Sequence, residues 1–186
     1  MTLKAELLSR ITQRYSEPHR RYHNMSHIGQ MFNAMTELRF ELTTLQILAI
    51  YGHDLVYYPS AKDNEEKSAR EMISLCDDLT ENQIVIVKAI IMSTKSHVPF
   101  PAALGQSEKV IDLDLSILAS NEEDYKRYVS QVRQEYYMIK DEYFNAGRKE
   151  FLKEFLKRDK IFQTTIGIEK LEQAARDNMM AEVGRY

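Results

Sequence analysis

Apolar residues recur at helical spacing along almost the whole chain, and little interrupts the pattern. Residues 3–11 carry leucines and an isoleucine on one helical face, and this stripe stops before Pro18. The 186 residues include only 6 glycines and 4 prolines, and three of these helix breakers fall within residues 97–105. We therefore expect an all-α protein, an irregular single-domain helical bundle spanning residues 1–186, with two helical halves on either side of this segment.

Capping signals and apolar stripes position the expected helices. The segment 42–57 is apolar nearly all round, so we expect a buried central helix that ends before Pro59. Asp63 or Asn64 can cap the next helix, and residues 80–83 form a capping box that opens another. The remaining helices are expected at about residues 3–11, 22 or 24–35, 84–94, 108–119, 122–140, 143–157 and 165–181.

The charge balance and the single cysteine limit the setting in which the chain works. With 25 basic and 28 acidic residues, the formal charge is −3, which argues against an extended nucleic-acid partner. A lone cysteine, Cys76, cannot form an internal disulfide, which fits a reducing compartment. The first six residues do not resemble a signal peptide, and no run of 18 apolar residues predicts a membrane span. We expect a cytoplasmic protein whose oligomeric state the sequence leaves open.

The sharpest polar motif is the string YHNMSH at residues 22–27. His23 and His27 are four residues apart, so on a helix they would stand on one face, one turn from each other. Two imidazoles at this spacing can meet one metal ion or one substrate. The same spacing also arises by chance between two surface histidines, so the motif gains weight only with partners elsewhere in the chain.

A second polar motif, His53 followed by Asp54, stands near the end of the most apolar segment. Burying a carboxylate without a partner costs on the order of several kcal/mol. A carboxylate exposed at a helix end beside a core histidine would avoid this cost. A metal ion also explains the pair, because it compensates the charge and uses an imidazole nitrogen together with a carboxylate oxygen.

A third motif is the string IDLDLS at residues 111–116. At about 100° per residue, the apolar residues of this segment spread over one broad arc, and Asp114 falls near its middle. Asp112 and Ser116 point to the opposite side, where Asp112 would be a solvated carboxylate. A core-facing Asp114 needs a cation or several hydrogen-bond donors.

In the order His27, His53-Asp54 and Asp114, these residues resemble the HD superfamily of metal-dependent phosphohydrolases, an all-α fold named for its His-Asp pair. The likeness to the predicted metal-dependent HD phosphohydrolase family of bacterial proteins covers most of the chain. The strings that carry it are YHNMSHI at 22–28, HDLVY at 53–57, NEEKSA at 64–69, LDLS at 113–116, VRQEY at 132–136, GR at 147–148 and ARDN at 175–178.

The resemblance implies roles for individual residues. One divalent ion (Mn, Mg, Zn, Fe, Co or Ni) would be held by four ligands, namely His27, His53, Asp54 and Asp114. The string at residues 22–27 also resembles that of cyclic nucleotide phosphodiesterases, in which the first histidine is a general acid and the second binds metal. Carried over, His23 would donate a proton to the leaving group.

Six further residues are candidates for contacting the substrate or supporting the site: Arg20, Arg21, Glu65, Lys95, His97 and Arg148. Arg20 and Arg21 directly precede the motif and could clamp phosphate oxygens, although arginines at a helix start are usually exposed. His97 or Glu65 could serve a second ion. Helix dipoles account equally well for Glu65, Lys95 and His97, and a packing contact accounts for Arg148.

The expected function is hydrolysis of a small phosphomonoester, phosphodiester or nucleotide-like compound through a metal-activated water. The Glu-Asp pair of stringent-response hydrolases, the Gly-Tyr-Pro triplet of cyclic-di-GMP enzymes and the His-Asp-x-Gly-His string of deoxynucleoside triphosphate hydrolases are all absent from the sequence. A di-iron oxygenase would need more histidine ligands than the chain obviously supplies. The alternative is a non-catalytic, metal-stabilised module for ligand sensing or protein interaction.

Overall fold

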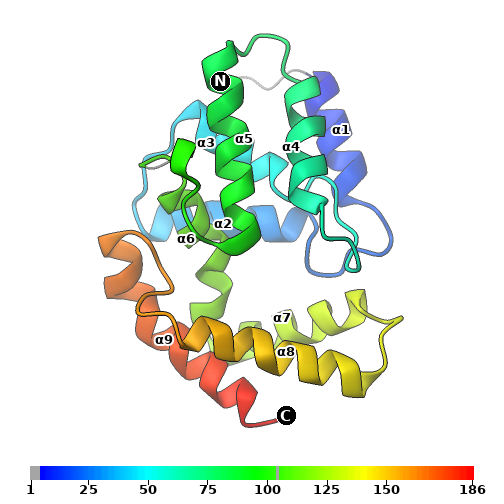
Figure 1. The fold of residues 1–186 in the computed structure, drawn as a ribbon, viewed down its shortest axis with the longest axis vertical. Coiled ribbons are helices and arrows are strands. Elements are labelled where there is room, and N and C mark those ends of the chain that lie inside the picture. The colour runs from blue at the N-terminus through cyan, green and yellow to red at the C-terminus, as the bar shows by residue number, and fades with distance from the viewer. Residues whose placement is uncertain (1–4, 104) are drawn as a thin grey trace.

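The computed structural model describes residues 5–103 and 105–186, and all regular secondary structure within these ranges is helical (Figure 1). The all-α prediction is therefore confirmed. Among the described helices, none is both long enough and apolar enough to cross a membrane. The elements are α1 (Ala5–Tyr15), α2 (Met25–Glu37), α3 (Thr44–Gly52), α4 (Asn64–Ser74), α5 (Glu81–Ser96), η1 (Pro101–Ala103), α6 (Glu108–Leu115), η2 (Ser116–Ala119), α7 (Glu122–Glu135), α8 (Asp141–Leu156) and α9 (Thr165–Val183).

The helices enclose two hydrophobic cores. The first core lies among α1 to α6, and the second lies among η2, α7, α8 and α9, which form the lower part of Figure 1. Helix α6 joins the cores, because Val110 and Leu113 belong to the first and Ile111 and Leu115 to the second. Asp114 lies between Leu113 and Leu115 and so stands where the two cores meet. This junction is where the candidate site lies.

Helix α3 is shorter than the predicted helix at 42–57. It starts with a capping box between Thr43 and Gln46 and ends at Gly52. A Cβ atom on Gly52 would lie 2.8 Å from Met72 Cγ and 2.9 Å from Ile91 Cδ1, so the end of α3 packs closely against α4 and α5. Residues 53–56 follow as a turn and a bend, in which His53 is buried and Leu55 belongs to the first core.

Asp112 is buried, which contradicts the prediction that it is a solvated carboxylate. Its two oxygens accept hydrogen bonds from the backbone N–H groups of Gln163 and Thr164, at 2.6 and 2.9 Å, and from the Thr164 hydroxyl. Thr164 is the N-cap of α9, so Asp112 anchors the start of that helix to α6. A Cβ atom on Gly167 would lie 2.2 Å from Asp112 Oδ2, which explains why a glycine occupies the first turn of α9.

Helix α7 ends at Glu135, five residues before the predicted end at Lys140. The Arg133 side chain donates hydrogen bonds to the carbonyl oxygens of Tyr136 and Ile139, both at 2.8 Å. These bonds occupy carbonyl oxygens just after α7 that would accept backbone N–H groups if the helix continued. The loop that follows carries exposed apolar residues and leads into α8. By contrast, the predicted capping box at residues 80–83 is confirmed at the start of α5.

Candidate metal centre

His27 lies in the first turn of α2 and is buried. Asn24 caps this helix, because its side-chain oxygen accepts a hydrogen bond from the Ser26 N–H at 2.8 Å. His23 therefore precedes the helix, and the prediction that both histidines share a helical face is wrong. The chain bend at Asn24 nevertheless keeps the two imidazole rings close, with centroids 6.1 Å apart.

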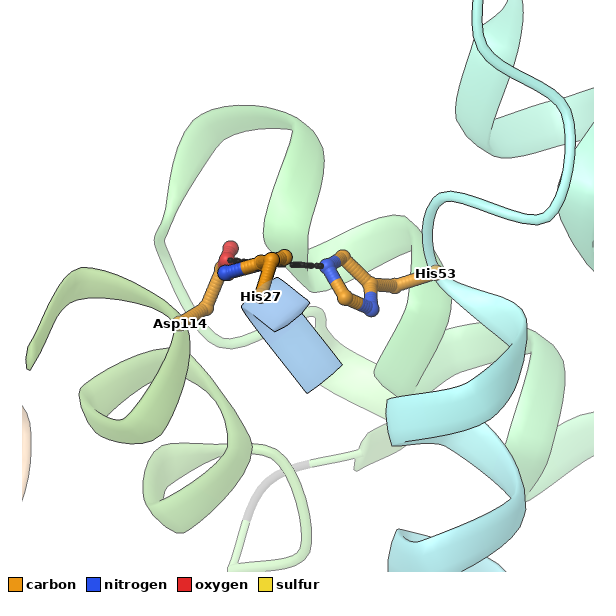
Figure 2. Close-up of side chains that lie close together, drawn as sticks. All are labelled: His27, His53 and Asp114. Atoms are coloured by element: carbon orange, nitrogen blue, oxygen red, sulfur yellow. Dashed lines mark hydrogen bonds and ion pairs between the residues drawn. The ribbon is translucent and has the colours of Figure 1, made fainter. Parts of the chain in front are cut away.

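His27, His53 and Asp114 come together from three elements (Figure 2). His27 Nε2 lies 3.2 Å from His53 Nε2 and 3.1 Å from Asp114 Oδ1, and His53 Nε2 lies 3.5 Å from the same carboxylate oxygen. All three ligand atoms lie within 4.8 Å of one another. Three of the four predicted metal ligands thus converge, and we call them the ligand trio.

The tautomer of His53 suits metal binding. Its Nδ1 lies 2.8 Å from the Ile50 carbonyl oxygen, which can only accept a hydrogen bond. Nδ1 therefore carries the proton, and the neutral ring presents the lone pair of Nε2 to the other two ligand atoms. A backbone carbonyl that orients a histidine in this way is the usual support of a metal-binding imidazole.

The electrostatics of the trio favour a bound positive charge. Burial raises the pKa of Asp114, but His53, His27 and His97 lower it more strongly, so the carboxyl stays ionised with a pKa well below its usual range. Burial lowers the pKa of His53, but the carboxylates of Asp54 and Asp114 outweigh it and hold that pKa well above the ordinary value. The site therefore needs a cation at this point, which either a proton or a metal ion can supply.

Two predicted residues flank the trio without belonging to it. Asp54 Oδ2 lies 3.2 Å from His53 Nε2, so this fourth predicted ligand touches one member of the trio. His97 Nε2 lies 3.3 Å from Asp114 Oδ2. His97 follows α5 in a left-handed conformation, with φ 52° and ψ 42°, which is uncommon for a residue other than glycine or asparagine. This conformation ends the helix beside the carboxylate of Asp114.

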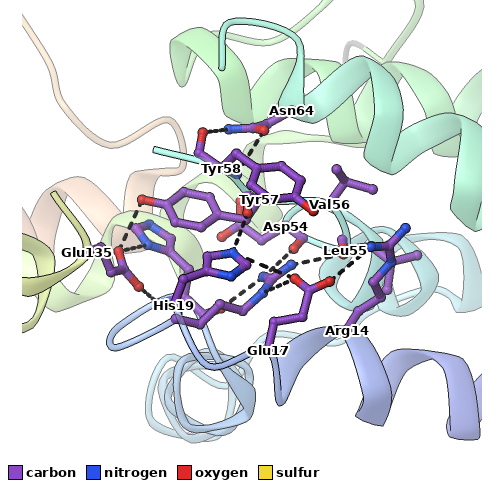
Figure 3. A network of polar contacts seen from close by, with 12 residues as sticks. Arg14, Glu17, His19, Asp54, Leu55, Val56, Tyr57, Tyr58, Asn64 and Glu135 are labelled. Atoms are coloured by element: carbon purple, nitrogen blue, oxygen red, sulfur yellow. Dashed lines mark hydrogen bonds and ion pairs between the residues drawn. The ribbon is translucent and has the colours of Figure 1, made fainter. Parts of the chain in front are cut away.

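His23 is held by a buried carboxylate that sequence reasoning missed. Glu135 Oε2 lies 2.6 Å from His23 Nδ1 and accepts a hydrogen bond from the Tyr57 hydroxyl at 3.1 Å (Figure 3). Its other oxygen accepts the backbone N–H groups of residues 21, 22 and 23 at 2.8 to 2.9 Å. The string VRQEY at 132–136 is the one sequence feature that included Glu135, and it implied no role for this residue.

The two members of this pair have shifted pKa values. Burial raises the pKa of Glu135, but the hydrogen bond and charge of His23 and the backbone donors bring it down to about 2. Burial lowers the pKa of His23, but the charges of Asp54 and Glu135 more than offset this, so that pKa lies above its ordinary value. These carboxylates favour the protonated form of His23, whose ring stacks on Tyr57 at 4.1 Å between centroids.

Arg20 is a brace and not a phosphate clamp, which corrects the expectation for this residue. Its buried guanidinium donates to the carbonyl oxygens of His23, Asp54 and Leu55 at 2.9, 2.7 and 3.0 Å and pairs with Glu17. It therefore ties the backbone of the first histidine motif to that of the His-Asp motif. Arg21, the other predicted clamp, has an exposed side chain, and neither arginine lines the cavity described below.

Two members of the ligand trio, His53 and Asp114, line a cavity of about 450 Å³ at the junction of the two cores. Its other polar lining residues include His23, Asp54, Glu65 and Lys95. Lys95 Nζ donates to Glu66 Oε1 at 2.6 Å and lies 3.8 Å from Glu65 Oε2. Glu65 and Lys95 thus line the same cavity as His53 and Asp114, each with a charged neighbour.

Arg148, on α8, also lines this cavity. Its guanidinium donates to both carboxylate oxygens of Glu182, at 2.9 and 3.1 Å, and to the Tyr128 hydroxyl at 3.1 Å. The charge of Arg148 is therefore neutralised within the protein. The buried Glu182 was not expected from the sequence, because its partners lie on α7 and α8.

Comparisons of the chain with protein-family models, with curated proteins and with solved structures find no match.

Proposed function

We propose that the protein is a metal-dependent phosphohydrolase that acts on a small phosphate ester. The observation that carries this proposal is the ligand trio of His27, His53 and Asp114, two of whose members line a cavity that His23 also lines. A two-histidine, one-carboxylate donor set suits a divalent ion, and imidazole ligands favour transition metals over magnesium. Three protein ligands are the number typical of catalytic sites, because they leave positions open for water and substrate.

The fit of an ion to these residues rests on their own chemistry. The lone pair of His53 Nε2 is directed at the trio, and the carboxylate of Asp114 stays ionised in a buried position. A divalent ion held there supplies Lewis-acid polarisation of a phosphoryl oxygen and activates water near neutral pH. Asp54, in contact with His53, adds negative charge that would strengthen the hold on a cation.

His23 is the group proposed to handle the leaving oxygen. In hydrolysis, a water oxygen forms a bond to phosphorus, the ester P–O bond breaks, and the departing alkoxide needs a proton. In its protonated form, His23 donates a hydrogen bond from Nδ1 to Glu135, which leaves the proton on Nε2 for transfer to the leaving oxygen. General-acid catalysis of this kind contributes about 10²–10⁴-fold to rate.

The test is a panel of phosphomonoesters and phosphodiesters assayed with Mn²⁺, Mg²⁺, Co²⁺ and Zn²⁺. We expect turnover with at least one metal and its loss in Asp114→Ala. The variant His23→Gln should slow alkyl esters by about 10²-fold and leave p-nitrophenyl esters much less affected, because that leaving group needs no proton.

An absence of turnover with every metal, or full activity in Asp114→Ala, would overturn the proposal. Metal-dependent stabilisation without any turnover would instead favour the alternative of a non-catalytic module that senses a ligand or binds a partner.

A further inference from the structure

The lining of the cavity has two chemically different parts. The residues that come from the segments around the ligand trio and from α4 and α5 are mainly polar, as described above. The residues that come from α7, the loop after it and α8, which lie below α4 and α5 in Figure 1, are mainly aromatic and aliphatic, and we call them the aromatic wall. Its members include Val132, Tyr136, Ile139, Tyr143, Phe144 and Phe151. An aromatic and aliphatic surface at this position packs against an apolar group and offers little to a charged one.

The aromatic wall carries no unpaired charge. Within the described chain, Arg148 is the one charged residue that α7 and α8 contribute to the cavity lining. Its Nε and Nη2 atoms donate hydrogen bonds to the Glu182 carboxylate. A second phosphate or a carboxylate at this end of a substrate would find no cation available to it. The wall therefore selects against a substrate that is charged at both ends.

A buried hydroxyl in the cavity lining lacks a partner. Tyr22 is 5% exposed, and its hydroxyl makes no hydrogen bond to any described residue. Its ring packs between Tyr128 and His27, at 4.7 and 4.8 Å between centroids. Tyr22 thus lies between the ligand trio and the aromatic wall. A buried polar group of this kind usually marks a place where a ligand atom or a water molecule completes the bonding.

Gly147 keeps the cavity open on the α8 side. A Cβ atom built on this residue meets no atom within 4 Å, although Gly147 lies in the middle of a helix and lines the cavity. A glycine inside a helix is unfavourable relative to alanine, and close packing does not require it here. The space beside Gly147 is therefore available to a bound molecule.

We infer that the substrate is a phosphate ester whose organic group is uncharged and aromatic. This inference rests on the proposed function: the phosphate lies toward the ligand trio, and a planar ring packs on the aromatic wall beside Gly147. Ring-to-ring packing is favourable in offset and edge-on geometries, and the wall already pairs Tyr136 with Phe144 at 5.6 Å between centroids. A cavity of about 450 Å³ holds one small molecule of this kind.

The first test compares 1-naphthyl phosphate with glycerol 3-phosphate as substrates in the presence of the activating metal. We expect kcat/KM to favour the naphthyl ester by about tenfold or more. Because naphthol is also the better leaving group, the contribution of the wall is the part of this preference that Gly147→Leu removes. In this variant a side chain fills the space beside the wall, so the ratio of the two kcat/KM values should fall by about threefold to tenfold. Gly29→Leu is the matched control, because Gly29 is also a helical glycine with open space around it and does not line the cavity.

The second test measures binding by calorimetry and does not require turnover. Tyr143 and Tyr137 are 67% and 69% exposed, but Tyr143 lines the cavity and Tyr137 does not. Tyr143→Ala should weaken the binding of 1-naphthyl phosphate by about threefold to tenfold, and Tyr137→Ala should leave it unchanged.

The outcomes separate this inference from the proposed function. A ratio of the two kcat/KM values that Gly147→Leu leaves unchanged would overturn the inference and leave hydrolysis standing. Binding of the naphthyl ester that depends on Tyr143, without turnover, would support the inference and overturn hydrolysis. Failure of the wild-type protein to bind 1-naphthyl phosphate would overturn the inference.

Discussion

Two buried clusters of polar side chains face the same cavity, and they are built in opposite ways. In the cluster around Glu182, both carboxylate oxygens receive the guanidinium of Arg148, and the hydroxyls of Tyr125 and Tyr186 donate to them at 2.6 and 2.8 Å. Every group in this cluster has a partner of opposite character. In the ligand trio, by contrast, two imidazole nitrogens and a carboxylate oxygen are directed at one another.

The contrast separates polar groups that stabilise the fold from polar groups that are arranged to bind a ligand. A buried ion pair with all its hydrogen bonds made requires nothing from outside the protein. Convergent lone pairs at 3.1 to 3.5 Å are costly unless a proton or a metal ion lies among them. The cluster around Glu182 therefore holds α7, α8 and α9 together, whereas the trio is the part of the molecule that binds something.

The largest effect is expected from breaking the closed cluster. Glu182→Ala leaves the buried guanidinium of Arg148 without its carboxylate, so the free energy of unfolding should fall by about 3–5 kcal/mol. Chemical denaturation monitored by circular dichroism measures this change. The double variant Arg148→Met, Glu182→Leu removes both charges and should recover most of the loss, since an apolar pair of similar size fills the same space.

Metal affinity is the control for that experiment. Neither Arg148 nor Glu182 belongs to the ligand trio, so the double variant should bind metal as the wild type does. A double variant that is as unstable as Glu182→Ala would show that the charges do not account for the loss. A double variant that is stable but no longer binds metal would show that the two clusters are not independent.

A somewhat smaller effect is expected from acid. Glu135, the buried carboxylate that holds His23 beside the trio, has a pKa of about 2 in the folded protein, below the ordinary 4.5. A carboxylate with a lowered pKa contributes stability that is complete above its unfolded pKa and is lost as the pH falls through its folded pKa. We expect this group to account for about 3 kcal/mol of lost stability between about pH 5 and pH 2.

Denaturation curves for the wild type and Glu135→Gln across this pH range provide the measurement. The variant should be less stable than the wild type at neutral pH, and the difference should shrink toward pH 2. Parallel pH profiles for the two proteins would contradict the assignment of a lowered pKa to Glu135.

The smallest effect is expected from two tyrosine hydroxyls. Tyr22→Phe removes a buried hydroxyl that lacks a partner, so the free energy of unfolding without ligand should rise by about 1 kcal/mol. Tyr125→Phe removes a donor to the Glu182 carboxylate and should lower the free energy of unfolding by about 1–2 kcal/mol. Opposite signs support the contrast between the clusters, and equal losses in both variants would argue against it.

Local sequence patterns were sufficient to predict a site residue where a polar side chain stands among apolar neighbours. Asp114 stands in the middle of an apolar arc and His53 follows the most apolar helix, and both belong to the ligand trio. The pattern of one segment carries this information, because the conflict is visible within a few turns of helix. The all-α class follows for the same reason.

Contacts between distant segments were not predictable in this way. Asp112 was expected in solvent, but its partners at the start of α9 lie 51 and 52 residues further along the chain. Glu135 reaches His23 across 112 residues, and nothing in the apolar pattern of α7 marks it. The end of α3 at Gly52 depends on close packing against Met72 and Ile91, which periodicity alone does not reveal.

The most direct test of the central claim is the metal content of the purified chain after equilibrium dialysis against Mn²⁺, Zn²⁺ or Fe²⁺. The wild type should retain about one equivalent of at least one of these ions. Asp114→Ala, with a helical circular dichroism spectrum like that of the wild type, should bind it at least about 100-fold more weakly. A wild-type chain that retains none of the three ions, or an Asp114→Ala chain that retains as much as the wild type, would contradict the claim that His27, His53 and Asp114 form a metal site.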